Sequence, residues 1–134
     1  MLTLHHLNNS RSQRILWLLE ELGVDYNIEH YQRDSITNLA PESLRAVHPL
    51  GRSPVLTTPE GAIAESGAIV EYLVRQHGQT NFTSPESGEN LQQYLFWLHF
   101  AEGSLMPPLV ARLVLERPVK KGLNLSLSNL LRIC

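Results

Sequence analysis

Residues 48–69, HPLGRSPVLTTPEGAIAESGAI, constrain the fold most, because a proline, a hairpin and a capped helix follow one another without a linker. Pro54 comes between a polar turn and the short apolar run Val55-Leu56, a position where proline begins a strand rather than interrupting one. A cis bond before proline costs little compared with other peptide bonds. Such a bond would turn the backbone of Val55 outward and leave its N–H and C=O unpaired at a sheet edge, where they can hold a peptide.

The rest of this stretch predicts a hairpin that leads directly into a helix. Pro59-Glu60-Gly61 supplies turn residues, and Ala62-Ile63-Ala64 predicts the returning antiparallel strand. Ser66 is a suitable N-cap for the apolar-periodic segment after it, and Gly78 follows as a C-terminal stop. Taken singly, these residues are common structural features. Their order is what suggests a binding site, because a helix N-terminus presents free N–H groups and suits a carboxylate ligand.

The first part of the chain predicts a β-α-β unit with parallel strands. Strand alternation at Leu2-Thr3-Leu4 and Tyr26–Tyr31 flanks an amphipathic helix over Arg11–Leu22. Ser10, with Gln13 three residues later, forms a capping-box pattern that would use the Ser10 hydroxyl on first-turn donors. The same hydroxyl lies at a strand-to-helix junction, where the helix dipole favours a bound thiolate. The two roles can coexist.

The later residues predict more helices. Pro41–Arg45 opens a short helix with Leu44 and Val47 facing inward. A polar linker over residues 79–88 precedes a long apolar helix from Leu91, of which at least two faces should be buried. Pro107-Pro108 should break or kink this helix before it resumes.

Composition excludes several classes of protein. The chain has 134 residues, of which 43% are hydrophobic and 18% charged, and a net charge of −2, so neither disorder nor a nucleic-acid footprint is expected. No apolar run approaches a membrane span, and no export leader precedes the first strand. The single cysteine, Cys134, excludes an internal disulfide or a CxxC pair. We therefore expect a cytoplasmic protein without a metal site, since its histidines are scattered.

Three segments closely resemble one subgroup of bacterial and fungal glutathione S-transferases, namely SRSQRILWLLEELG, HPLGRSPVL and ESGAIVEYL. The resemblance implies an α/β fold with a thioredoxin-like N-terminal domain, of order βαβ-α-ββα, followed by a partial all-helical C-terminal domain. It implies a glutathione-binding domain over residues 1–78, a linker over 79–88 and a partial helical domain over 89–134.

The resemblance also implies a set of site residues. The segment SRSQR resembles the S-x-x-x-R pattern of serine-type transferases, so Ser10 would be the catalytic hydroxyl. The glutathione-binding residues would be Arg52 for the glycyl carboxylate, Val55 for the cysteinyl backbone, and Glu65 and Ser66 for the γ-glutamyl end. Pro54 would be the cis-proline, and Glu102 would approach the site of the neighbouring subunit.

The implied function is conjugation of reduced glutathione, as co-substrate, to a small-molecule electrophile. Such transferases form homodimers, here through the helix from Ser66 and the aromatic helix from Leu91 to about Glu102. Two alternatives stay open, a non-catalytic transferase-like binding or assembly module and a truncated, inactive transferase. A redoxin is disfavoured, because Ser10 stands where its active-site cysteine would be needed.

The end of the chain differs from the rest in composition. Residues 119–134 contain Lys120, Lys121 and Arg132 and no acid, whereas all 13 acids lie before residue 117. This tail does not resemble the next helix of the family. A truncated or frame-shifted end is therefore expected, with a short divergent C-terminus as the alternative.

Overall fold

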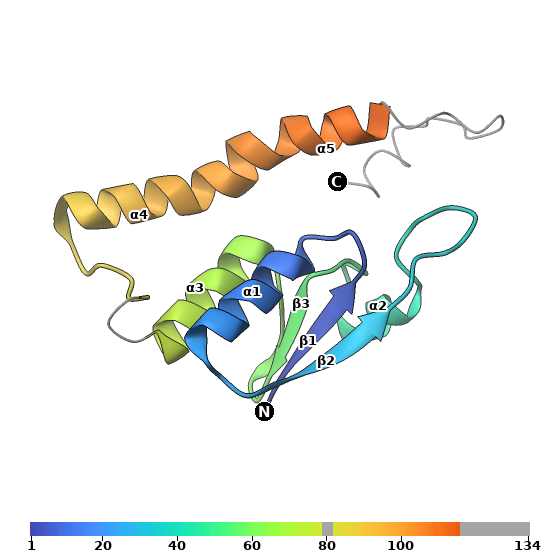
Figure 1. Ribbon diagram of the computed structural model, residues 1–134, viewed down its shortest axis with the longest axis horizontal. Coiled ribbons are helices and arrows are strands. Elements are labelled where there is room, and N and C mark those ends of the chain that lie inside the picture. Colours follow the sequence, from blue (N-terminus) through green and yellow to red (C-terminus); the bar gives the residue numbers. More distant parts are fainter. Residues whose placement is uncertain (79–81, 116–134) are drawn as a thin grey trace. The chain divides into compact units, whose positions relative to one another are not determined.

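The computed structural model describes residues 1–78 and 82–115. These residues form two compact units that divide after Leu91 (Figure 1). The first unit contains a four-stranded sheet and its helices, in the order β-α-β-α-β-β-α that the sequence predicts. The second is helical. The tail over residues 119–134 lies outside the described residues.

The sheet has the strand order β2-β1-β3-β4. Its strands are β1 (Leu2–Leu7), β2 (Tyr26–Tyr31), β3 (Val55–Thr58) and β4 (Gly61–Ala64). β1 pairs in parallel with β2 and antiparallel with β3, and β3 pairs antiparallel with β4. β1 is longer than the sequence predicts, because its whole length, including His5 and His6, pairs with β2.

Helix α1 (Ser12–Leu22) carries the predicted apolar stripe and ends at Gly23, which has a φ of 64°. The predicted capping box does not form. Arg11 occupies the N-cap position and makes no side-chain cap. The Ser10 hydroxyl instead accepts a hydrogen bond from the N–H of Ser12, two residues on, at 3.1 Å. It therefore still satisfies a donor of the first turn, but not the one that the capping-box pattern specifies.

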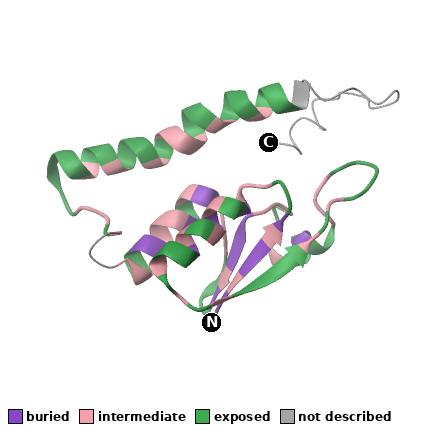
Figure 2. Cartoon of the chain, in the orientation of Figure 1, coloured by how far each residue is buried: buried purple, intermediate pink, exposed green. Residues whose placement is uncertain are grey.

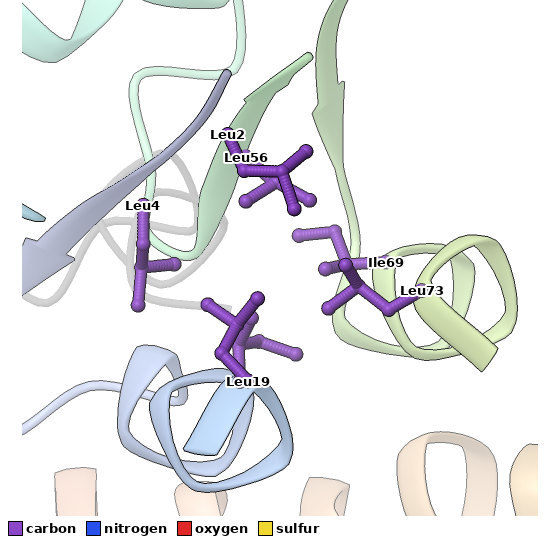
Figure 3. Close-up of a cluster of buried hydrophobic side chains, with 7 residues drawn as sticks. Leu2, Leu4, Leu19, Leu56, Ile69 and Leu73 are labelled. Atoms are coloured by element: carbon purple, nitrogen blue, oxygen red, sulfur yellow. The ribbon is translucent and has the colours of Figure 1, made fainter. Parts of the chain in front are cut away.

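Helices α1 and α3 (Ser66–His77) cover one face of the sheet. Figure 3 shows leucine and isoleucine side chains from β1, β3 and both helices pointing toward one another. The cluster consists of Leu2, Leu4, Ile15, Leu19, Leu56, Ile69 and Leu73, all at most 5% exposed. Burying each such side chain contributes about 1.5–3 kcal/mol. Outside this cluster, the short helix α2 (Ser43–Val47) fully buries Leu44, while Val47 is half-buried.

The expected edge position of the strand after Pro54 is wrong. β3 lies between β1 and β4, and Val55 is opposite His5 on one side and Ala64 on the other. Its side chain is fully buried. The reason is that β1 pairs with β3 as well as with β2, so the lateral edges are β2 and β4.

The helical unit bears on two expectations. A helical run of α4 (Gly88–Phe100), the π-helix η1 (Ala101–Leu105) and α5 (Met106–Leu115) continues through Pro107-Pro108, so the break that these prolines predict does not occur. The run does depart from α-helical geometry in η1, directly before the prolines, where a proline inside a helix removes backbone hydrogen bonds. None of the residues of α4 is fully buried in this single chain (Figure 2), and the expected cover of two of its faces stays a prediction. In the described part of the chain no helix has the length and apolarity needed to cross a membrane.

Candidate functional site

A small hollow lies where the loop before β3, the end of β4 and the start of α3 meet. Its lining consists of Arg11, Leu50, Arg52, Ser53, Pro54, Ala64, Glu65 and Ser66. The enclosed space is about 20 Å³, which accommodates about one water-sized group. A ligand larger than this must therefore lie across the mouth and place only one small group, such as a carboxylate, inside.

The start of α3 forms one wall of this hollow. Glu65 precedes the helix with a φ of 74°, a left-handed conformation that costs a non-glycine residue energy and is concentrated at functional sites. The Ser66 hydroxyl is buried, and its oxygen has no hydrogen-bond partner among the described residues. Since buried polar groups are nearly always paired, an external acceptor is the simplest partner for it. The dipole of this 12-residue helix makes an anion the favoured one.

The loop between β1 and α1 brings Ser10 to the edge of the hollow. Ser10 Oγ lies 3.2 Å from Ser53 Oγ and 2.7 Å from Ser12 Oγ. Ser53 lines the hollow, so a group bound over Ser53 is within reach of the Ser10 hydroxyl. Ser12 is fully buried, and its Oγ lies 2.9 Å from His6 Nδ1.

Ser53 and Pro54 fix the floor of the site. The Ser53 hydroxyl donates a hydrogen bond of 2.9 Å to the carbonyl oxygen of His5, and the Ser53–Pro54 peptide bond is cis. This hydrogen bond connects β1 to residues far along the chain. The loop that carries Ser10 and the loop that carries Ser53 and Pro54 are therefore held against each other.

His5 supports the site from within the sheet. Its Nε2 lies 2.9 Å from Thr57 Oγ1 and its Nδ1 lies 3.0 Å from the Tyr31 hydroxyl, so one imidazole joins β1 to β3 and β2. Burial lowers the pKa of His5, and the nearby Glu29 opposes this in part. Burial also raises the pKa of Tyr31. Both groups are therefore favoured in their neutral forms.

Arg33 holds the loop that carries Ser10. Its guanidinium donates hydrogen bonds of 2.9 Å to the carbonyl oxygens of Asn8 and Asn9, and one of 3.1 Å to that of Asn38. Asn9 has a φ of 54°, so the loop turns sharply just before Ser10. Three hydrogen bonds from one side chain limit the positions that this turn can take.

Most of the predicted binding residues meet at the hollow. Arg52, Pro54, Glu65 and Ser66 line it, and Ser10 reaches it through Ser53. Val55 does not line it, because its side chain points into the core. Glu102 lies in η1, in the second unit.

Sequence reasoning missed four residues that shape the site: His6, Ser12, Arg33 and Ser53. A signal was present for one of them, since Ser12 follows Ser10 at a spacing that places two hydroxyls at the start of one helix. The others act through contacts with residues distant in sequence, which no local pattern indicates. Within residues 1–78 and 82–115, no three His, Cys, Asp or Glu side chains gather as a metal site would require.

The fold and the site define a thioredoxin-like domain with a hollow beside a cis-proline. The sequence model of the glutathione S-transferase N-terminal domain matches residues 1–75. Glutathione S-transferase 3 of Schizosaccharomyces pombe is 44% identical over 119 residues, which are 89% of this chain and 48% of that protein. The chain therefore belongs to the glutathione S-transferase family.

Solved structures agree with this assignment. A glutathione S-transferase from Actinobacillus pleuropneumoniae is 41% identical, with a TM-score of 0.71, over 75% of this chain and 47% of that one. A family member from Pseudomonas fluorescens Pf-5, solved with bound glutathione, is 26% identical, with a TM-score of 0.69, over 90% of this chain and 60% of that one. The chain spans about half the length of the curated relatives it matches.

Proposed function

We propose that this chain binds reduced glutathione at the hollow and activates its thiol for attack on a small-molecule electrophile. The observation that carries the proposal is the buried Ser66 hydroxyl without a partner, at the N-terminus of α3. The family assignment supports it, as does the glutathione bound in the Pseudomonas fluorescens structure.

The γ-glutamyl end fits the inner part of the hollow. Its carboxylate would accept hydrogen bonds from the Ser66 hydroxyl and from N–H groups at the start of α3, where the helix dipole adds to the attraction. Its ammonium group would pair with the exposed carboxylate of Glu65. Arg52, which also lines the hollow, would hold the glycyl carboxylate. An extended tripeptide would then lie across the mouth between Arg52 and the start of α3.

The cysteinyl unit would lie between them, over Ser53. Sequence reasoning assigned its backbone contact to Val55, but Val55 is an interior residue of the sheet, whereas Ser53 lines the hollow. We therefore move this contact to the backbone of Ser53. The sulfur would then lie beside Ser10, whose hydroxyl is 3.2 Å from that of Ser53. A thiol pKa near 8.5 must fall by about 2 units for thiolate to prevail at neutral pH.

Binding is tested by titrating glutathione into the protein in a calorimeter. Ser66→Ala should weaken binding by about 1–2 kcal/mol, because the carboxylate loses a charge-assisted hydrogen bond. It should not lower the stability of the free protein, because the hydroxyl has no partner to lose. Ser43→Ala, at the equivalent first position of α2, is the matched control and should leave affinity unchanged. Equal affinities for all three proteins would exclude this hollow as the glutathione site.

Catalysis is tested separately through Ser10. Ser10→Ala should reduce conjugation to a chromogenic electrophile by up to about a hundredfold at neutral pH, if the hydroxyl supplies most of the pKa shift. Affinity for glutathione should change by only a few-fold, because the hydroxyl acts on the sulfur. Glutathione binding without turnover in the unmodified protein would favour the non-catalytic module instead.

The dimer and the cytoplasmic location stay predictions. Support for a dimer comes from α4, where Phe96, Trp97 and Phe100 form a ring cluster, with Phe96 and Trp97 more than half exposed. Two copies that share this aromatic surface would cover it and would place Glu102 near the site of the other subunit. Sedimentation at rising concentration decides this point, since a constant mass near 15.2 kDa would exclude the dimer.

A further inference from the structure

A chain of hydrogen-bonding groups runs inward from Ser10. Ser10 Oγ lies 2.7 Å from Ser12 Oγ, and Ser12 Oγ lies 2.9 Å from His6 Nδ1. The N–H of Ser12 also donates to Ser10 Oγ. The proposed function uses only the Ser10 hydroxyl and assigns no role to Ser12 or His6.

If the Ser12 proton is used within this chain, counting protons leaves only two directions for it. Each serine hydroxyl has one proton to donate and two lone pairs to accept with. If Ser12 donates to Ser10, its proton is used, and the Nδ1 of His6 must carry a hydrogen and donate to Ser12. If the Nδ1 of His6 is bare, Ser12 donates to it, Ser10 donates to Ser12, and no Ser10 proton is left for a sulfur.

Two contacts favour the first direction. Ser53 already donates its only proton to the carbonyl oxygen of His5, so at the contact with Ser10 it can only accept. Ser10 must therefore donate toward Ser53 if that contact is a hydrogen bond. A competing acceptor for Ser12, the carbonyl oxygen of Leu7, lies 3.5 Å away, much farther than Ser10.

We propose that His6, protonated on Nδ1, and Ser12 are positioning residues that direct the Ser10 hydroxyl toward the sulfur of bound glutathione. Ser12 fills both lone pairs of Ser10 Oγ, one with its N–H and one with its hydroxyl, so the Ser10 proton points outward. In the free protein this proton is donated toward Ser53, and bound glutathione, lying over Ser53, would offer the sulfur as the acceptor in its place. No proton is transferred along the chain. Hydrogen bonds in such a series polarise one another, so the outermost hydroxyl becomes a stronger donor to a thiolate. This proposal rests on the proposed glutathione chemistry at Ser10.

The direction of the chain is measurable in the free protein, without glutathione. Nitrogen NMR of the neutral imidazole distinguishes the two tautomers, and the His6 signals are assigned by their loss in His6→Phe. We expect hydrogen on Nδ1 in the unmodified protein and a return toward the Nε2-protonated form in Ser12→Ala. A bare Nδ1 in the unmodified protein would overturn the proposal, because the chain would then run the other way.

The effect on the sulfur is measured through the ultraviolet absorbance of bound thiolate as pH is raised. Ser12→Ala and His6→Phe should each raise the pKa of the bound thiol by about 1 unit and slow conjugation about threefold at pH 7. The rate should recover at higher pH, and KM for glutathione should rise by no more than about threefold, because only the hold on the thiolate weakens. His6→Asn, whose amide can donate from the position of Nδ1, should keep the thiol pKa of the unmodified protein.

His30→Gln is the matched control, because the His30 ring contacts that of His6 but is not part of the chain. This variant should ionise the bound thiol as the unmodified protein does. An unchanged thiol pKa in both Ser12→Ala and His6→Phe would overturn the positioning role of Ser12 and His6 while leaving the proposed function intact. If the unmodified protein bound no glutathione, the proposed function would fail, and the tautomer of His6 would still decide the direction of the chain.

Discussion

The two units of this chain differ in what their apolar residues do. In the described residues, every fully or nearly buried hydrophobic side chain lies between Leu2 and Val74. The helical run from α4 to α5 is richer in leucine and aromatic residues than the first unit, yet Leu95, Phe96, Trp97, Leu105, Leu109 and Leu113 are each more than a third exposed. Figure 2 shows the same contrast.

This contrast shows that an apolar sequence can predict a helix without predicting whether its apolar side chains are buried. In the first unit each helix stripe has a sheet face to pack against, and the core closes around Leu4 and Leu56. In α4 no residue is fully buried, although Leu91, Tyr94 and Leu98 are half-buried along one side of the helix. The candidate hollow is built entirely from the packed unit, so its geometry depends on that core.

The largest effect is expected when one leucine in each unit is changed to alanine and the losses of stability are compared. Leu56→Ala should lower the free energy of unfolding by about 2–5 kcal/mol, because Leu56 is fully buried and its loss leaves a cavity. Leu109→Ala, at a side chain 52% exposed, should change it by less than about 0.5 kcal/mol. Urea denaturation followed by circular dichroism measures both, and similar losses would contradict the contrast.

The aromatic surface of α4 offers the next test. Trp97 is 60% exposed and contacts the rings of Phe96 and Phe100 edge-on, so it is a candidate anchor of a homodimer. Trp97→Lys should weaken self-association by about 2 kcal/mol, as loss of an aromatic anchor does at protein interfaces. Sedimentation equilibrium gives the dissociation constant. The exposed Trp17 of α1, changed to lysine, is the control, and an identical effect there would indicate non-specific association.

A smaller effect is expected at the loop that holds Ser10. Arg33→Ala removes three hydrogen bonds to backbone carbonyls and should cost about 1 kcal/mol of stability, since these bonds lie at the surface. Conjugation should fall by a larger factor than glutathione affinity, because the loop positions the Ser10 hydroxyl, the proposed catalytic group. Arg75→Ala breaks only an i,i+4 pair with Glu71 and should cost about 0.3–0.5 kcal/mol without altering the rate.

The smallest effect is the acid sensitivity of the packed unit. Burial holds the pKa of His5 below its unfolded value of about 6.5, so the unfolded chain takes up the proton first. The stability contributed by neutral His5 is therefore present above about pH 6.5 and is lost as pH falls toward the folded pKa. Melting temperatures between about pH 7.5 and 5.5 should show this decline, and His5→Gln should flatten it.

An unchanged slope in His5→Gln would assign the decline to other groups. The carboxylates of Asp34 and Glu60 are not candidates, because hydrogen bonds from Thr37 and Thr58 respectively lower their pKa values. Both therefore titrate below this range.

The sequence pattern predicted those helices, strands and turns whose formation depends on neighbouring residues alone. Strand β2 and helix α1 were predictable because alternation and an i, i+3, i+4 stripe have no competing explanation there. The hairpin at Pro59-Glu60 was predictable from turn residues. The length of β1 was not, because it depends on pairing with β2 and β3, and neither was the interior position of β3.

The residues of the candidate site also divide into those that the neighbouring sequence predicts and those that it does not. Arg52, Glu65 and Ser66 were predictable because they adjoin a strand start or a helix start in one continuous stretch. Ser53, His6 and Arg33 were not, because each acts through residues at least six positions away, and up to 48 for the Ser53 hydrogen bond to His5. The effect of Pro107-Pro108 was predictable only in part, because the helical run continues through the prolines but is irregular in η1 directly before them.

The hydrogen bonds of Ser53 also set when the site can exist during synthesis of the chain. Ser53 contacts Ser10 and His5 across 43 and 48 positions, and the hollow needs Ser66 as well. A nascent chain that has emerged only through β2 can pair β1 with β2, yet it has no floor for the ligand. Closing loops of this length costs conformational entropy before their contacts stabilise the chain. A fragment ending before α3 would therefore lack part of the proposed binding site, and only the whole packed unit could present it.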